Sequence, residues 1–195
     1  KLDESDFIDQ MIVLGYIPDL YPSDSSEEVL FSKLVEVFLC EWGTRMGYES
    51  RNVKQKASYE DVIFEIDGKV IVSDAKSFRL SRSQKAPNVK DFVKPEDYRK
   101  WLDRHEDGLG GLVAYPCTHE WVGKSDAYRY CSTESTPIVM LPYKYLAFVL
   151  GSKKTDDNSI DISPLWDYSR HFPDSVLSRI EYWEAMDKAV LEITK

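Results

Sequence analysis

The sequence predicts an α/β domain in which helices flank a mixed β-sheet, and three observations indicate it. Two apolar, β-branched runs at residues 61–66 and 69–76 enclose an Asp-Gly pair, which is typical of a hairpin. Apolar residues recur at helical spacing from Phe31 to Trp42. The predicted order is helix, hairpin, helix, strand, strand, helix, as in a sheet covered by helices. We expect residues 1–195 to form a single domain.

The first long helix is predicted to begin at residues 25–28, where two serines precede two acids that favour a helix N-terminus. Its core-facing stripe consists of Phe31, Val35, Phe38 and Trp42. Gly43 and Gly47 are expected to end the helix. Glu28 lies three residues before the stripe, so its carboxylate either extends the buried face or occupies an exposed helix end.

The hairpin places two carboxylates face to face. With the Asp-Gly pair as a two-residue loop, Asp61 lies directly opposite Asp74, with the two Cβ atoms about 5 Å apart. Lys76 lies two residues beyond Asp74 and therefore points to the same face. Both faces of the hairpin also carry apolar residues, which predicts central strands covered on both sides.

The remaining elements are predicted from shorter patterns. We expect strands at 111–115 and 137–141, helices at 97–105 and 143–150, and a polar loop at 152–163. A closing amphipathic helix is expected from Asp174 onward, packed on the core or on a partner subunit.

Composition limits the function classes. The net charge of −9 argues against a non-specific nucleic-acid coat protein. Between Arg51 and Lys100, however, twelve basic and eight acidic residues give a local charge of +4, which favours one polyanion-binding face. Ordinary solvated charge is the alternative. Three cysteines without paired spacing indicate reduced thiols and a cytoplasmic setting, and no apolar stretch is long enough to cross a membrane.

Two opposed carboxylates can hold a hard divalent cation for phosphodiester hydrolysis. Asp61 and Asp74 are the predicted ligands, with the backbone carbonyl of Ala75 as a third and Glu28 as a direct or water-mediated fourth. Lys76 is expected to orient or deprotonate the attacking water, or to neutralise charge at phosphorus. The alternative is that Lys76 forms only a structural ion pair with one of the aspartates.

Three segments resemble HindIII-type restriction endonucleases of the PD-(D/E)xK superfamily. They read DAKSFRLSR at residues 74–82, EVLFSK at 28–33 and DVI at 61–63, in a match that spans about Ser23 to Trp166. The resemblance implies the restriction-endonuclease-like fold and a Mg²⁺-dependent, homodimeric type II DNA endonuclease that leaves 5′-phosphates. It assigns the catalytic roles to Glu28, Asp61, Asp74 and Lys76, and Mn²⁺ is an expected substitute. Glu60 occupies the position of the superfamily's proline.

Basic residues follow the catalytic lysine and are expected to bind double-stranded DNA, through phosphates more than through bases: Arg79, Arg82, Lys85, Lys90 and Lys94. A solvated loop is the alternative. The sequence therefore favours a site-specific nuclease of a prokaryotic cytoplasm. It leaves open the cleavage module of a larger type IIS enzyme, a repair or recombination nuclease, and a non-catalytic DNA-binding protein on the same scaffold.

Overall fold

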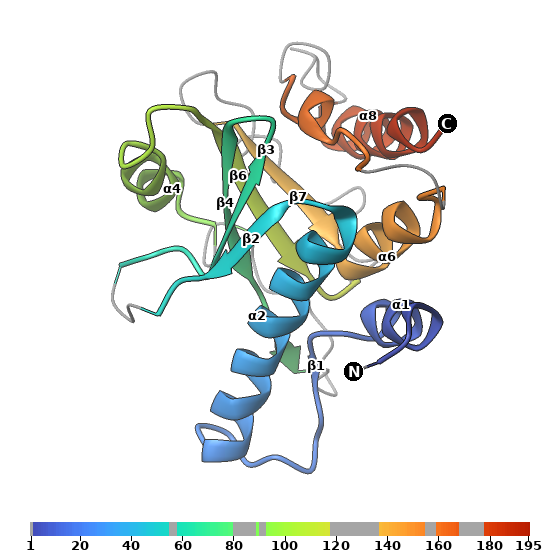
Figure 1. The fold of residues 1–195 in the computed structure, drawn as a ribbon. Coiled ribbons are helices and arrows are strands. Elements are labelled where there is room, and N and C mark those ends of the chain that lie inside the picture. The colour runs from blue at the N-terminus through green and yellow to red at the C-terminus, as the bar shows by residue number, and fades with distance from the viewer. Residues whose placement is uncertain are drawn as a thin grey trace.

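The structure is a computed structural model that describes residues 2–54, 58–79, 89, 93–117, 137–154, 159–167 and 178–195 (Figure 1). Its elements are α1 (Glu4–Ile12), β1 (Tyr16–Ile17), α2 (Ser26–Met46), β2 (Glu49–Asn52), β3 (Val62–Ile66), β4 (Lys69–Ala75), β5 (Phe78–Arg79), α4 (Pro95–Leu102), β6 (Gly108–Tyr115), β7 (Ile138–Pro142), α6 (Tyr143–Gly151), the 3₁₀ helix η2 (Ser163–Trp166) and α8 (Ser178–Ile193).

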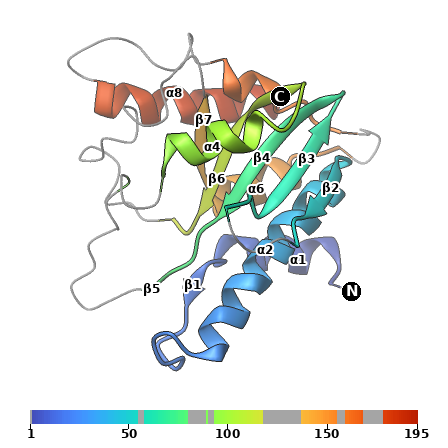
Figure 2. The same cartoon turned by 90° about the vertical axis from the view of Figure 1, so that its left-hand side faces the viewer.

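The central sheet is mixed, which confirms the predicted α/β class. Its strand order is β2-β3-β4-β6-β7, with antiparallel pairing from β2 to β4 and parallel pairing from β4 to β7. Figure 1 and Figure 2 show α4 on one face of this sheet and α2 with α6 on the other. Strand β4 therefore lies in the middle of the sheet between two layers of helices, as its two apolar faces indicated.

The hairpin has the predicted register. Val62 pairs with Ser73 and Ile66 with Lys69. Asp67 and Gly68 both have positive φ, 49° and 75°, as the tight two-residue hairpin turn requires. Asp61 lies just before β3, and its amide donates to the carbonyl of Ser73 at 2.9 Å, so the pairing extends to the predicted carboxylate.

Helix α2 begins where the sequence indicated, since the Ser25 hydroxyl accepts a hydrogen bond from the Glu28 amide at 3.2 Å. It ends at Gly47, whose φ of 93° is left-handed. The prediction that Gly43 also ends the helix is wrong. A Cβ at Gly43 would lie 2.4 Å from the Phe64 ring, so this glycine lets α2 pack closely on β3.

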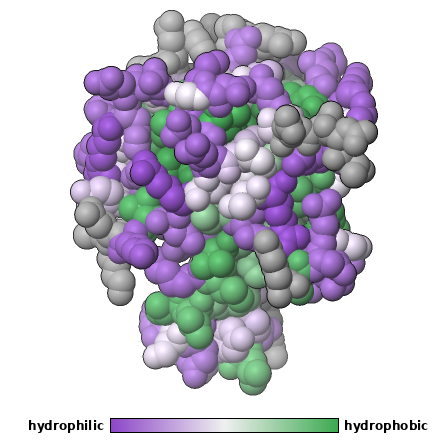
Figure 3. All heavy atoms as spheres, viewed as in Figure 1, coloured by the Kyte–Doolittle hydropathy of each residue, from purple (hydrophilic) through white to green (hydrophobic). Residues whose placement is uncertain are grey.

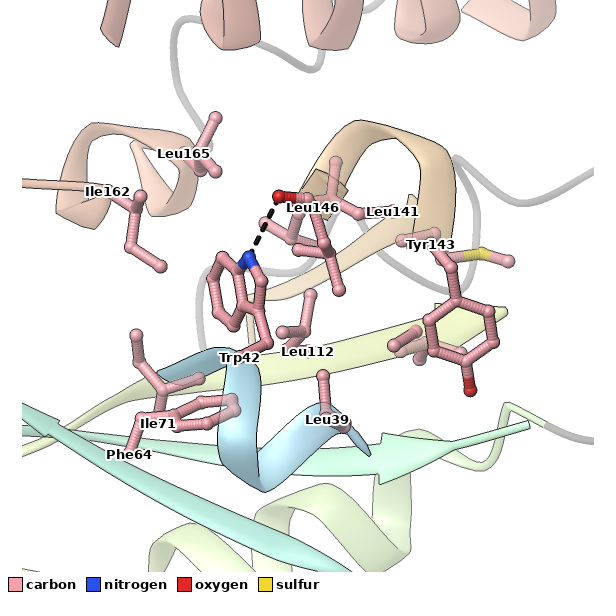
Figure 4. Packing of buried hydrophobic residues seen from close by; sticks show 14 of the residues in the cluster. Leu39, Trp42, Phe64, Ile71, Leu112, Leu141, Tyr143, Leu146, Ile162 and Leu165 are labelled. Carbon is pink, nitrogen blue, oxygen red and sulfur yellow. Dashed lines mark hydrogen bonds between the residues drawn. The ribbon is translucent and has the colours of Figure 1, made fainter. Parts of the chain in front are cut away.

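The core joins α2, the sheet and α6 around Trp42 (Figure 4). The Trp42 ring meets the Phe64 ring edge-on, with centroids 5.7 Å apart, and its Nε1 donates to the carbonyl of Leu146 at 2.8 Å. Both groups of this hydrogen bond are buried, so leaving either unpaired would be costly. The packing holds α2 across the hairpin that carries the candidate site.

Candidate active site

Strand β4 carries Asp74 at its end, with Lys76 two residues further on. Asp74 is buried, with 9% of its surface exposed, and its Oδ2 lies 2.5 Å from the Lys76 Nζ. The same oxygen accepts a hydrogen bond from the Tyr98 hydroxyl of α4 at 3.3 Å. The Tyr98 ring packs directly against Gly111, where a Cβ would lie 2.3 Å from the ring.

Asp61 lies beside Asp74, as the hairpin register predicted. Its Oδ2 accepts a hydrogen bond from the Ala75 amide at 2.9 Å, and its carboxyl is also hydrogen-bonded to that of Asp74. The pKa of Asp61 is raised to about 8, first by burial and then by the adjacent Asp74 carboxylate, while the Ala75 hydrogen bond acts in the opposite direction. Two crowded carboxyls that retain a proton near neutral pH fit a divalent cation, which would displace that proton.

The backbone of Lys76 is held on several sides. Its amide donates to the Ala114 carbonyl at 2.8 Å, and its carbonyl accepts from the Tyr143 hydroxyl at 2.9 Å. Gly15, with φ of 85°, packs so closely that a Cβ there would lie 3.0 Å from the Lys76 carbonyl oxygen. These contacts fix the backbone of Lys76 and so the direction in which its side chain extends from the strand.

Glu28 lies at the N-terminal end of α2, and the structure pairs it with Arg79. The Arg79 Nε and Nη2 contact the two Glu28 carboxylate oxygens at 3.0 and 2.9 Å. This hydrogen bond, followed by one from the Asp24 amide, lowers the pKa of Glu28. In the described part of the chain, the predicted helix acid and one predicted DNA-binding residue therefore bind each other.

Glu36 is an acid of α2 that sequence reasoning missed. Its side chain is 14% exposed and contacts the Lys33 Nζ at 2.6 Å. Its charge contributes to the raised pKa of Asp61 and of buried Tyr143, so it lies near the aspartate pair. A signal existed, because Glu36 is an acid within an otherwise apolar run of the helix, two turns beyond Glu28.

Most of the other predicted DNA-binding residues are not among those that the structure describes. Arg82, Lys85 and Lys90 lie outside the described residues, whereas Lys94 is exposed at the N-cap of α4. Among described residues, no group of three His, Cys, Asp or Glu side chains is arranged to hold a metal ion. Asp61 and Asp74 thus supply two carboxylate ligands, and a further ligand has to be a carbonyl, a water or a substrate oxygen.

Two acids and a lysine thus lie at the end of a central hairpin, on a mixed sheet flanked by helices, which is the arrangement that the resemblance to PD-(D/E)xK nucleases led us to expect. The family model for HindIII restriction endonuclease matches residues 2–195, so the chain belongs to this family.

Two known proteins are similar to this chain, one in sequence and one in fold. The chain is 28% identical over 179 residues to the type II restriction enzyme HindIII of Haemophilus influenzae, a match covering 87% of this chain and 55% of that enzyme. The chain therefore spans about half the length of this relative. Its fold is similar to the small subunit of the heterodimeric restriction endonuclease R.BspD6I, with a TM-score of 0.58 and 11% identity over 96% of this chain and 98% of that one.

Proposed function

We propose that this protein is a type II restriction endonuclease that makes site-specific double-strand cuts in DNA with Mg²⁺ as its cofactor. The observation that carries the proposal is the Asp61–Asp74 carboxyl pair beside Lys76, in a chain of the HindIII family. Restriction endonucleases of this kind generally use divalent metal ions. We expect Mn²⁺ to substitute for Mg²⁺, because both accept hard oxygen ligands.

Each residue of the site has a separate role in the proposed cleavage reaction. Asp61 and Asp74 would hold the cation together with the Ala75 carbonyl, and the bound ion would acidify a water and stabilise charge on the phosphate. Lys76, whose Nζ lies 2.5 Å from Asp74 Oδ2, would orient the attacking water or donate to a phosphate oxygen. Tyr98 donates a hydrogen bond to the same Asp74 oxygen and so helps to hold the carboxylate in place.

The helix acid of the site is proposed to be Glu36, with Glu28 as the alternative given by the family resemblance. Both acids pair with a basic residue, Glu36 with Lys33 and Glu28 with Arg79, and it is the charge of Glu36 that contributes to the raised pKa of Asp61. Glu36→Gln and Glu28→Gln form a matched pair that separates the two. If Glu36 has this role, only the first variant should raise the Mg²⁺ concentration required for cleavage; the reverse result would restore Glu28.

DNA binding is proposed for the basic residues after the active site: Arg79, Arg82, Lys85, Lys90 and Lys94. Each is expected to contact a phosphate, which holds the duplex against the site. Arg79 binds Glu28 in the free protein, so a phosphate contact by Arg79 would exchange one anionic partner for another. Removing a phosphate-binding lysine should weaken binding to all sequences and reduce its salt dependence.

A homodimer is proposed because a cut in both strands requires two such sites. Half of α2 projects from the body, and Figure 3 shows apolar residues gathered over it. Its exposed residues include Val29, Leu30, Leu34 and Val37, with exposed fractions of 46–71%. They present roughly 400 Å² per copy, so two copies would bury about 800 Å² of apolar surface, close to the roughly 1,000 Å² of a specific interface once a polar rim is added.

Light scattering tests the dimer. The wild-type chain should have twice the monomer mass, and Leu30→Lys with Leu34→Lys should give monomers. Leu191→Lys, at an exposed apolar position on α8, is the matched control and should leave the dimer intact. A wild-type monomer would refute the homodimer, and a dimeric double variant would refute this surface.

Cleavage of phage DNA with Mg²⁺ tests the function itself. Discrete bands are expected, whereas a smear would indicate a nuclease without sequence specificity and uncut DNA would contradict the proposal. Lys76→Ala should abolish cutting while leaving DNA binding in place.

The single-domain architecture and a prokaryotic cytoplasmic location remain predictions. In the residues that the structure describes, no helix combines the length and apolar character needed to cross a bilayer.

A further inference from the structure

Glu60, the residue before Asp61, is buried with only 3% of its surface exposed. A buried carboxylate is costly unless charged or polar groups surround it. Glu60 also occupies the position at which the superfamily motif has proline, so the backbone before Asp61 lacks the rigidity of a proline ring. Its burial therefore requires an explanation beyond a solvated surface acid.

Its carboxylate binds the turn that follows α4. Oε2 lies 3.3 Å from Arg104 Nη1, and Oε1 lies 3.4 Å from His105 Nε2. The same arginine stacks on the Tyr59 ring, 3.9 Å from its centroid, and donates to the Ser58 carbonyl at 3.0 Å. All three residues that precede Asp61 are thus held by residues more than forty positions later.

Helix α4 also contacts the segments that carry Asp61 and Asp74. Trp101, also in α4, donates from Nε1 to the Ser58 carbonyl at 3.0 Å, while Tyr98 donates to Asp74. On its other side, Asp61 is fixed by its own backbone, whose amide binds Ser73 and whose carbonyl accepts from Val53, each at 2.9 Å. The segment 58–61 is therefore held by hydrogen bonds at Ser58 and at Asp61.

We propose that Glu60, through Arg104 and His105, is a positioning residue that sets the separation of Asp61 from Asp74. Carboxyl oxygens that converge on one position repel each other, and this repulsion acts to move Asp61 away from β4. The contacts of Glu60 oppose that movement, so the two metal ligands stay at the spacing a single cation needs. The inference rests on the proposed function, since it concerns metal binding by Asp61.

Metal dependence of cleavage separates positioning from general stability. Glu60→Gln keeps the shape of the side chain and removes its charge, and Glu65→Gln makes the same chemical change at an exposed site on β3. We expect Glu60→Gln to raise the Mg²⁺ concentration for half-maximal cleavage by about tenfold, as for other residues that orient metal ligands. Excess Mg²⁺ should recover most of the rate, and Glu65→Gln should match the wild type.

A purely structural role would instead lower the thermal midpoint and the folded fraction without moving the half-maximal Mg²⁺ concentration; that result would overturn the inference. Arg104→Lys gives a second reading if Glu60→Gln fails to fold, because it keeps the positive charge but loses the forked contact and the stacking on Tyr59. It should raise the Mg²⁺ requirement in the same direction, and an unchanged requirement would count against positioning.

Asp61→Asn distinguishes failure of this inference from failure of the proposed function. An inactive Asp61→Asn variant together with a Glu60→Gln variant of normal Mg²⁺ requirement would overturn only the positioning role. Unimpaired cleavage by Asp61→Asn would overturn both. Titration of the isolated protein with Mn²⁺, followed by thermal shift, should show the same loss of affinity for Glu60→Gln without any DNA present.

Discussion

Metal binding should expel a proton from the aspartate pair. Burial and the Asp74 carboxylate raise the pKa of Asp61 to about 8, so most metal-free molecules hold this proton at pH 7. A proton with this pKa weakens apparent metal affinity about 100-fold at pH 6 but only about twofold at pH 8. The affinity for Mg²⁺ or Mn²⁺ should therefore rise about 50-fold between pH 6 and pH 8.

Isothermal titration calorimetry checks this reasoning in two ways. Titrations with Mn²⁺ at pH 6, 7 and 8 give the affinities directly. Repeating the pH 7 titration in buffers of different ionisation enthalpy counts the released protons, of which about 0.9 per ion is expected. Asp61→Asn should bind more weakly and lose the pH dependence. An affinity that changes less than a few-fold, with no proton released, would refute the shared-proton arrangement.

Three further predictions follow from single contacts and charges. Gly43→Ala should lower the free energy of unfolding in urea by about 1–2 kcal/mol. The new Cβ would lie 2.4 Å from Phe64, and the cost of this overpacking exceeds the gain in helix propensity. An unchanged or higher free energy of unfolding would show that the core can relax around the methyl group. Tyr98→Phe should slow cleavage about fivefold, or about 1 kcal/mol, through the lost hydrogen bond to Asp74, and wild-type single-turnover rates would exclude that role. Because the pKa of Asp61 is raised in the folded protein, its contribution to the stability of the metal-free protein should be full below about pH 4 and lost as the pH rises toward 8. Thermal melts across this range should show the decline in stability, and saturating Mg²⁺ should make the decline smaller.

The sequence by itself determined the parts that depend on near neighbours. Asp-Gly flanked by apolar runs fixed the hairpin and its register, because a two-residue loop leaves one pairing that buries both faces. Alternation along a strand then placed Lys76 on the same side as Asp74. Of the stripe predicted for α2, Val35 and Trp42 are buried, whereas Phe31 and Phe38 are only partly buried against the core.

Only the tertiary structure decided which distant groups meet. Strand β2 is short and polar, so no periodicity marked it, and it exists because β3 offers it an edge. Glu28 meets Arg79, and Glu60 meets Arg104, through packing of segments more than forty residues apart. Charge patterns along a chain do not specify such pairs, since their energy depends on a burial and a geometry that the folded core creates.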